Sequence, residues 1–324
     1  MYDTQVHVVV DANILAAGFC PVTHKDDTVR QRSEILVKSI CELGWPYVRL
    51  YAPSICIAEA LGVIDKFRYC TWHGDLKHDP SKQLSEEDYR NVLSKLNDSV
   101  KTRKIVQIEH EPDHVLFSNL ISPVNMYFQL TDSSPMGATD CVIGAFAILM
   151  KTRLSCRRVI LVTADTRLSS VINKCRNLTK EEAQQLNLIE TAEACGIKWS
   201  QEIYPECIHF KDTTDDDLVK HFLGWPLPTR PFHYTMIDDL LPEDKLALCR
   251  LWRETSNKYS GVTPDNLPYT IALDDLKTQL AAKYQILMSN EDIFRRIVNW
   301  RKSSTWPDGG NSTTREQSDL LFDK

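Results

Sequence analysis

The sequence predicts an α/β protein built around a parallel sheet and followed by a small helical domain. Two runs rich in β-branched residues, 6–10 (VHVVV) and 159–162 (VILV), each lead into an aspartate and then a helical pattern. Continuous apolar strands of this kind are typical of parallel strands that are buried on both faces. After residue 240, three amphipathic segments follow one another without a strand pattern between them. The alternation indicates a parallel sheet, and the final segments indicate a separate helical part.

The length of the chain indicates two domains. Its 324 residues, 43% of them apolar and 25% charged, can bury a substantial core, and the chain is longer than one typical domain. The acidic run DTTDDD and the prolines of GWPLPTRP mark a boundary. We expect an α/β domain at 1–211 and a helical domain at 212–324, whose polar end, STWPDGGNSTTREQSDLLFDK, is expected to be a flexible tail.

In the first half of the α/β domain, helices and strands are expected to alternate. Residues 28–43 place apolar side chains at helical spacing, and residues 47–52 (YVRLYA) predict a strand that stops at Pro53. Ser54 can cap the next helix, SICIAEALGVIDKF. The polar stretch from about 69 to 112 contains a helical pattern and a short strand pattern, IVQIE, and is expected to be a helical insertion.

In the second half of this domain, the alternation of helices and strands is expected to continue and then to end. The segment SPMGATDCVIGAFAILMKTR predicts a largely apolar helix that begins near Pro135. The strand at 159–162 leads into the helix TRLSSVINKC. One further helix, TKEEAQQLNLIETAEAC, is expected, with Thr179 and Glu182 spaced as a capping box and Gly196 as its stop.

Four acids occupy positions that this topology brings to one edge of the sheet. Asp11 and Asp165 follow the two β-branched strands, and Glu59 and Asp140 lie in the early turns of helices. Ligands of open parallel sheets bind beyond the carboxyl ends of the strands. Each acid alone has a common structural role as a helix cap, turn residue or surface group. Four gathered carboxylates, however, resist ionisation unless cations neutralise them, and oxygen ligands favour Mg²⁺ or Mn²⁺.

The segments around these acids, VVVDANIL, IAEALGVI, ATDCVIGAFAI and LVTADTRL, resemble the four successive acidic motifs of the PIN-domain ribonucleases. The resemblance covers about residues 6–195 and implies a three-layer α/β/α sandwich around a parallel sheet. It also implies endonucleolytic hydrolysis of RNA with Mg²⁺ or Mn²⁺ as cofactor. The stretch 69–112 and the C-terminal domain depart from the small PIN toxins of bacterial toxin–antitoxin pairs. The residues implied to bind metal and to act in catalysis are Asp11, Glu59, Asp140 and Asp165, with Asn13 and Thr163 as supporting polar residues.

Other functions compete with this prediction. A phosphatase of the haloacid dehalogenase type needs an aspartate where Asn13 stands, and a Rossmann nucleotide-binding protein needs a glycine-rich loop where only Gly18 is present. Two alternatives stay open. One is a catalytically silent PIN-like module that binds RNA or docks a protein. The other is a DNA nuclease, because metal-assisted hydrolysis does not distinguish the sugar.

Nucleic-acid contacts are expected from local basic patches, because the net charge of −6 excludes a protein that coats nucleic acid through bulk charge. In the C-terminal domain, RRIVNWRK combines Arg295, Arg296, Arg301 and Lys302 with Trp300, although a tryptophan is more often a core residue. That domain is also expected to bind a regulatory protein or a second copy of the chain. Phosphate contacts near the acids are expected from Arg153, Arg157, Arg158, Arg167, Lys174 and Arg176.

The cellular context is expected to be cytoplasmic, without contact to a membrane. No segment approaches the roughly 18 consecutive apolar residues of a membrane helix, and the first residues lack a signal-peptide pattern. The ten cysteines are scattered singly and are expected to be reduced and mostly buried. A zinc site at Cys70, His73 and His78 would need a fourth ligand from elsewhere in the chain.

Overall fold

The computed structural model describes most of the chain as two units. Packing divides the chain into Met1–Leu218 and Val219–Lys324. Each unit has its own core and is described by itself. The described residues are 5–20, 26–69, 83–128, 136–153, 158–222, 225, 232–234 and 240–309.

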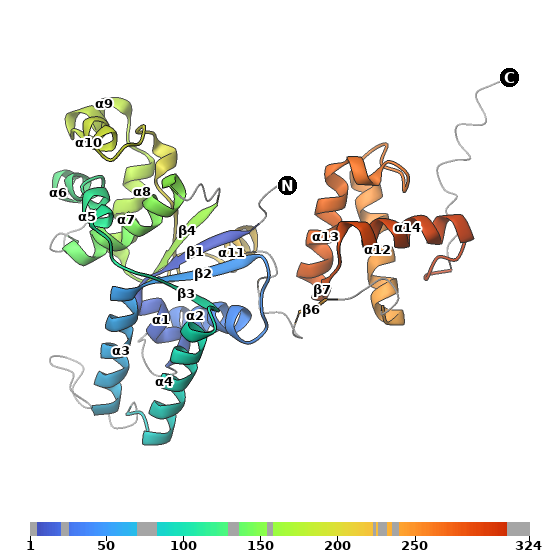
Figure 1. The fold of residues 1–324 in the computed structure, drawn as a ribbon, viewed down its shortest axis with the longest axis horizontal. Coiled ribbons are helices and arrows are strands. Elements are labelled where there is room, and N and C mark those ends of the chain that lie inside the picture. Colours follow the sequence, from blue (N-terminus) through green and yellow to red (C-terminus); the bar gives the residue numbers. More distant parts are fainter. Residues whose placement is uncertain are drawn as a thin grey trace. The chain divides into compact units, whose positions relative to one another are not determined.

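A five-stranded parallel sheet is the centre of the first unit (Figure 1). Its strand order is β3-β2-β1-β4-β5, and all neighbouring strands run parallel. The chain moves outward from β1 to β3 and then returns to the other side of β1 for β4 and β5. The connections therefore reverse direction between β1 and β4, which is where open α/β sheets bind their ligands. The strands are β1 (Val6–Val10), β2 (Val48–Pro53), β3 (Ile105–Ile108), β4 (Val159–Thr163) and β5 (Glu206–His209).

Helices flank this sheet, and Figure 1 shows α1 and α2 on one side of it and α7 and α8 on the other. The predicted α/β class with a central parallel sheet is confirmed, whereas the likeness to PIN domains stays a prediction. The helices of this unit are α1 (Ala12–Phe19), α2 (Asp27–Cys41), α3 (Ser54–Tyr69), α4 (Glu86–Lys101), α5 (Pro112–Ser118), α6 (Ser122–Phe128), α7 (Ala138–Arg153), α8 (Thr166–Arg176), α9 (Lys180–Gln185), α10 (Leu188–Ala194), the 3₁₀ helix η2 (Gln201–Ile203) and α11 (Asp215–His221).

The core of this unit forms where the apolar runs predicted it. Strands β1 and β4 are buried along their whole lengths, because helices cover both faces of a parallel sheet. Gly18 permits a close approach of α1 to α2. A Cβ atom at this position would lie 2.5 Å from Cγ2 of Val37 and 3.0 Å from the carbonyl oxygen of Ser33. The missing side chain at Gly18 therefore lets α1, which starts directly after β1, lie close against α2.

Two expectations about this unit are wrong. The single helix expected from Thr179 is two helices, α9 and α10, because Asn187 adopts a left-handed conformation with φ of 54° between them. The strand alternation does not end there, since β5 adds a fifth strand beside β4. In the stretch 69–112, by contrast, the expected helical pattern and the expected strand IVQIE are both present, as α4 and as β3, which pairs with β2 as an edge strand.

The acidic run near residue 212 begins a helix, α11, whose first residues belong with the first unit. Arg32 of α2 donates hydrogen bonds to the carbonyl oxygens of Phe210 and Thr213, and its guanidinium lies 2.9 Å from the Asp215 carboxylate. These bonds hold the segment after β5 against α2. The division between the units falls inside α11, and the expected boundary at 211–212 lies before it.

The second unit contains the three helices that the sequence predicted, together with a short strand pair. Trp300 is buried in its core and lies with its ring centre 5.9 Å from that of Trp306, so it is not an exposed stacking platform. Arg301 pairs with Asp265 at 2.7 Å, which engages one of the cations expected at a nucleic-acid surface. The elements are β6 (His233–Tyr234), α12 (Pro242–Lys258), the 3₁₀ helix η3 (Leu267–Tyr269), α13 (Ile271–Tyr284), β7 (Ile286–Leu287) and α14 (Asn290–Ser303).

Two further features of the described residues concern the expected cellular context. None of the described helices combines the length and the apolar character that a bilayer-spanning segment requires. The described cysteines form no disulfide, and all of them except Cys207 are buried. The zinc ligands considered at Cys70, His73 and His78 lie outside the described residues.

The bonds of Arg32 generate a prediction about stability. Replacing Arg32 by Met should lower the free energy of unfolding by about 2 to 3 kcal/mol, because backbone carbonyls after β5 lose a charged donor. The control is Arg30→Met on the same helix, whose pairs with Asp27 and Glu34 lie at the surface and are expected to contribute less than about 0.5 kcal/mol. Urea denaturation of both variants measures the difference, and equal losses would contradict it.

Candidate metal centre

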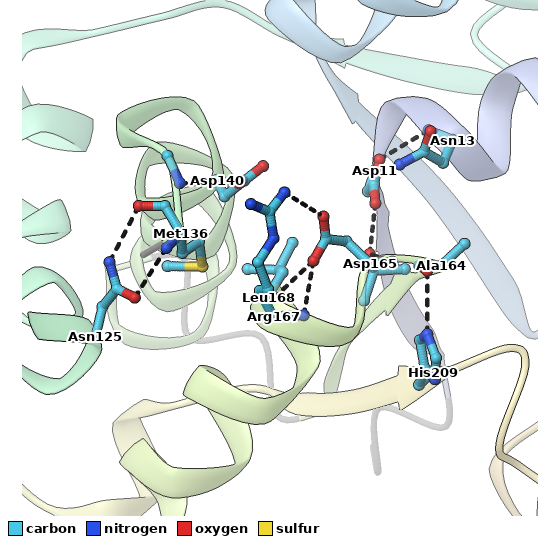
Figure 2. A network of polar contacts seen from close by, with 12 residues as sticks. Asp11, Asn13, Asn125, Met136, Asp140, Ala164, Asp165, Arg167, Leu168 and His209 are labelled. Carbon is cyan, nitrogen blue, oxygen red and sulfur yellow. Dashed lines mark hydrogen bonds and ion pairs between the residues drawn. The ribbon is translucent and has the colours of Figure 1, made fainter. Parts of the chain in front are cut away.

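The pairing of β1 with β4 places two of the four acids side by side (Figure 2). Asp11 follows β1 and caps α1, and Asp165 follows β4 and caps α8. Val10 pairs with Val162 at the end of the ladder, and the backbone N–H of Asp11 donates to the Val162 carbonyl oxygen at 3.2 Å. The two strand-to-helix turns therefore start from the same level of the sheet.

The Thr163 hydroxyl connects these two turns. It accepts a hydrogen bond from the backbone N–H of Asp165 at 2.9 Å and donates its own proton to Oδ2 of Asp11. The other oxygen of Asp11, Oδ1, accepts from the backbone N–H of Asn13 at 2.8 Å. The orientation of the Asp11 carboxylate is therefore set by a buried side chain at the end of β4 and by the first turn of α1.

Asp11 is almost completely buried, with 4% of its surface exposed. Burial raises its pKa to about 6, while the hydrogen bonds from Thr163 and Asn13 lower it, and the charges of Asp140 and Asp165 raise it further. The last two causes show that these acids act on Asp11 electrostatically. The ionised carboxylate is therefore destabilised where it lies.

Asp140 and Glu59 complete the group from two helices. Asp140 lies in the first turn of α7, and its Oδ2 accepts from the backbone N–H of Gly137 at 3.2 Å. Burial and then the charge of Asp165 raise its pKa. Glu59 lies at the surface of α3, and partial burial followed by the charge of Asp140 raises its pKa. The four acids are thus linked in pairs through their charges.

Arg167 supplies a positive charge inside this group. Its guanidinium Nη2 lies 3.2 Å from Oδ2 of Asp165, and Figure 2 shows the side chain between Asp140 and Asp165. Burial raises the pKa of Asp165, but hydrogen bonds from the Arg167 side chain and from the backbone of Leu168 and Arg167 outweigh it and hold the pKa below its usual value. The sequence suggested Arg167 as a phosphate contact, and the structure pairs it with an acid.

Two buried side chains that the sequence analysis missed support the turns of the site. Nε2 of His209 lies 3.1 Å from the Ala164 carbonyl oxygen, and Nδ1 lies 2.6 Å from Oδ2 of Asp212. Asn125 donates to the Met136 carbonyl oxygen at 3.1 Å and accepts from the Met136 N–H at 3.0 Å, just before the helix of Asp140. His209 ends β5, which its short mixed sequence did not predict, and no spacing in the sequence relates Asn125 to Met136.

Other residues suggested from the sequence lie elsewhere or have other partners. Arg153 is at the far end of α7 from Asp140, about 20 Å along the helix axis by residue spacing, and pairs with Asp113. Arg158 precedes β4 and so lies at the opposite edge of the sheet from the acids.

The remaining residues suggested from the sequence have other partners or other roles. Lys174 pairs with Glu182 at 2.8 Å. Asn13 contributes its backbone N–H, and its side chain is exposed. Arg157 lies outside the described residues.

The chemistry of the donors suits a hard divalent cation, since carboxylate oxygens are the ligands that Mg²⁺ and Mn²⁺ prefer. The side chains are not arranged as a finished coordination sphere. Within the described residues, no group of three or more His, Cys, Asp and Glu side chains is placed to hold a metal ion.

Comparison of the chain with models of protein families, with curated proteins and with solved structures found no match.

The raised pKa of Asp11 predicts how stability depends on pH. A carboxyl whose pKa is about 6 in the folded protein and 3.8 when unfolded stabilises the fold below about pH 4, and this contribution is lost as pH rises through 6. The Asp11→Asn variant has no carboxyl to ionise at this buried position, so it does not lose this contribution as pH rises. In EDTA, the variant should gain stability relative to the wild type as pH rises from 4.5 to 8, by roughly 2 kcal/mol. Denaturation curves at several pH values test this, and a constant difference across the range would contradict it.

Proposed function

We propose that the protein is a metal-dependent nuclease that hydrolyses phosphodiester bonds, with RNA as substrate and internal bonds as the sites of cleavage. One observation carries the proposal. Acids from four separate elements, the ends of β1 and β4 and the helices α3 and α7, lie at the carboxyl edge of a parallel sheet, where the charges of neighbouring acids raise the pKa values of Asp11, Glu59 and Asp140. The caps of α1 and α8 give Asp11 and Asp165 a structural role, but the repulsion among the gathered carboxylates is unfavourable, and a ligand of opposite charge is a reason to maintain it.

The ligand proposed is Mg²⁺ or Mn²⁺, held by Asp11, Glu59, Asp140 and Asp165. When bound, such an ion supplies the positive charge that activates a water and stabilises charge on the phosphate. The protein contributes the position of the ligands. Thr163 and the N–H of Asn13 orient Asp11, and the cap of α8 orients Asp165.

Water is the nucleophile that the surrounding groups favour. Cys56 is one of the thiols near the acids, and burial, followed by the charges of Asp11 and Glu59, raises its pKa far above neutral. It therefore stays protonated and is a poor nucleophile. The Thr163 hydroxyl already donates its proton to Asp11. Neither group favours a covalent intermediate, which agrees with direct hydrolysis.

The two alternatives from the sequence differ in what they require of the acids. A silent module that docks RNA or protein has no use for a buried carboxylate whose ionisation is unfavourable, so the raised pKa of Asp11 favours the enzyme. A DNA nuclease would use the same acids in the same way. The choice of RNA rests on the resemblance to PIN-domain ribonucleases alone.

The proposal predicts that cleavage depends on the metal and on the acids. Wild-type protein should cut structured RNA in Mg²⁺ or Mn²⁺ and lose the activity in EDTA. Asp11→Asn and Asp140→Asn should each lower the rate by at least about a hundredfold, since even groups that only support a metal ligand contribute about ten- to a hundredfold. The matched control is Asp216→Asn, an exposed acid in the first turn of α11.

Fragment formation on RNA and on single-stranded DNA measures these rates. Cleavage of DNA alone, abolished by the same variants, would replace the ribonuclease by a DNA nuclease. Folded protein that cuts neither substrate in either metal would contradict the enzyme and favour the silent module. A comparable loss of activity in Asp216→Asn would show that the effect is not specific to the four acids.

A further inference from the structure

The two oxygens of Asp165 have different partners. Oδ1 accepts from the backbone N–H groups of Arg167 at 2.7 Å and of Leu168 at 3.2 Å, which is the cap of α8. Oδ2 faces the guanidinium of Arg167 at 3.2 Å. Because Oδ1 is committed to the helix end, Oδ2 is the oxygen that Asp165 can offer to another cation.

Arg167 is placed to influence more than one acid. Its positive charge lowers the pKa of Asp140 as well as interacting with Asp165, in agreement with its position between them in Figure 2. The arginine is thus the neighbouring charge that offsets part of the repulsion in the group. A cation that binds the same carboxylates must either share them with this guanidinium or displace it.

We propose that Arg167 is an internal competitor for the metal: its guanidinium holds Oδ2 of Asp165, and a divalent cation binds this oxygen when the arginine side chain moves away. The inference rests on the proposed metal site and adds a residue that sets its affinity. Two positive groups on one carboxylate oxygen repel each other, so sharing is unfavourable. Removing the arginine therefore strengthens metal binding, although the protein loses an ion pair.

The contacts of Arg167 allow its side chain to leave without unfolding the site. The side chain is 36% exposed, so it can reach solvent by rotating about its own bonds. Its backbone N–H stays on Oδ1, and the cap of α8 is kept. The donors on Asp11 differ in this respect, since one is the backbone N–H of Asn13 in the first turn of α1 and the other is the hydroxyl of the buried Thr163 at the end of β4.

The test is a titration of the full chain with Mn²⁺. The loss of the electron paramagnetic resonance signal of the free ion measures how much Mn²⁺ is bound. Arg167→Gln should bind Mn²⁺ about tenfold more tightly than the wild type, the change that corresponds to a lost hydrogen bond between charged groups. The matched control is Arg176→Gln, which removes the same charge at the last residue of the same helix. Its affinity should stay close to that of the wild type. Thermal unfolding in EDTA checks that each variant is folded.

The outcomes separate this inference from the proposed function. Unchanged or weaker Mn²⁺ binding by Arg167→Gln, with wild-type binding that Asp11→Asn abolishes, would overturn the competition and leave the metal site standing. An equal gain in Arg176→Gln would also overturn it, because net charge alone would then explain the effect. No binding by the wild type or by Arg167→Gln would overturn both proposals. Binding by Arg167→Gln but not by the wild type would support both.

Discussion

The pairing of β1 with β4 is the constraint on which the candidate site depends. These strands lie next to each other although about 150 residues separate them in the chain, since Val10 pairs with Val162. Their turns then meet, and the Thr163 hydroxyl joins Asp165 to Asp11. Asp11 and Asp165 are the cap residues that precede α1 and α8. The hydrogen bonds that cap these helices therefore also orient the two carboxylates.

The acids of the site lie where burial and nearby charges make the ionised form of a carboxyl unfavourable. Burial of Asp11 opposes its ionisation, and the neighbouring acids oppose it further. The structure relieves this repulsion only in part, with backbone donors at Asp11 and with Arg167 at Asp165. Such incomplete compensation is common at functional sites, where a ligand supplies the missing charge. The arginine then has two effects, because it stabilises the acids and also opposes a cation that would bind them.

The supporting residues extend the site into parts of the chain that lack the acidic motifs. His209 reaches the turn after β4 from β5, and Asn125 of α6 holds the segment that leads to Asp140. These side chains are buried and hydrogen-bonded on two sides. Their role is to fix backbone between the acids, which explains why a site built from motifs alone would omit them.

The sequence by itself determined the local elements and the order of the acids. Continuous apolar runs predicted β1 and β4 to within one residue, because strands buried on both faces need apolar side chains throughout, and the run YVRLYA before Pro53 predicted β2 equally closely. It also indicated the three helices of the second unit through their helical periodicity. The break at Asn187 and the strand β5 escaped prediction, since one depends on a left-handed residue and the other on a short segment whose place comes from its neighbour β4.

Only the tertiary structure decided which partners the charged groups have. Arg167 could equally have faced solvent or a phosphate, and its pairing with Asp165 follows from the geometry of the α8 cap. Arg153 and Arg158 have the same sequence neighbourhood as the acids but lie at the other ends of α7 and β4. Trp300 could have been a surface residue and is instead packed in a core. Local patterns record which faces are apolar, whereas the distance between charged side chains depends on packing between segments that are far apart in the chain.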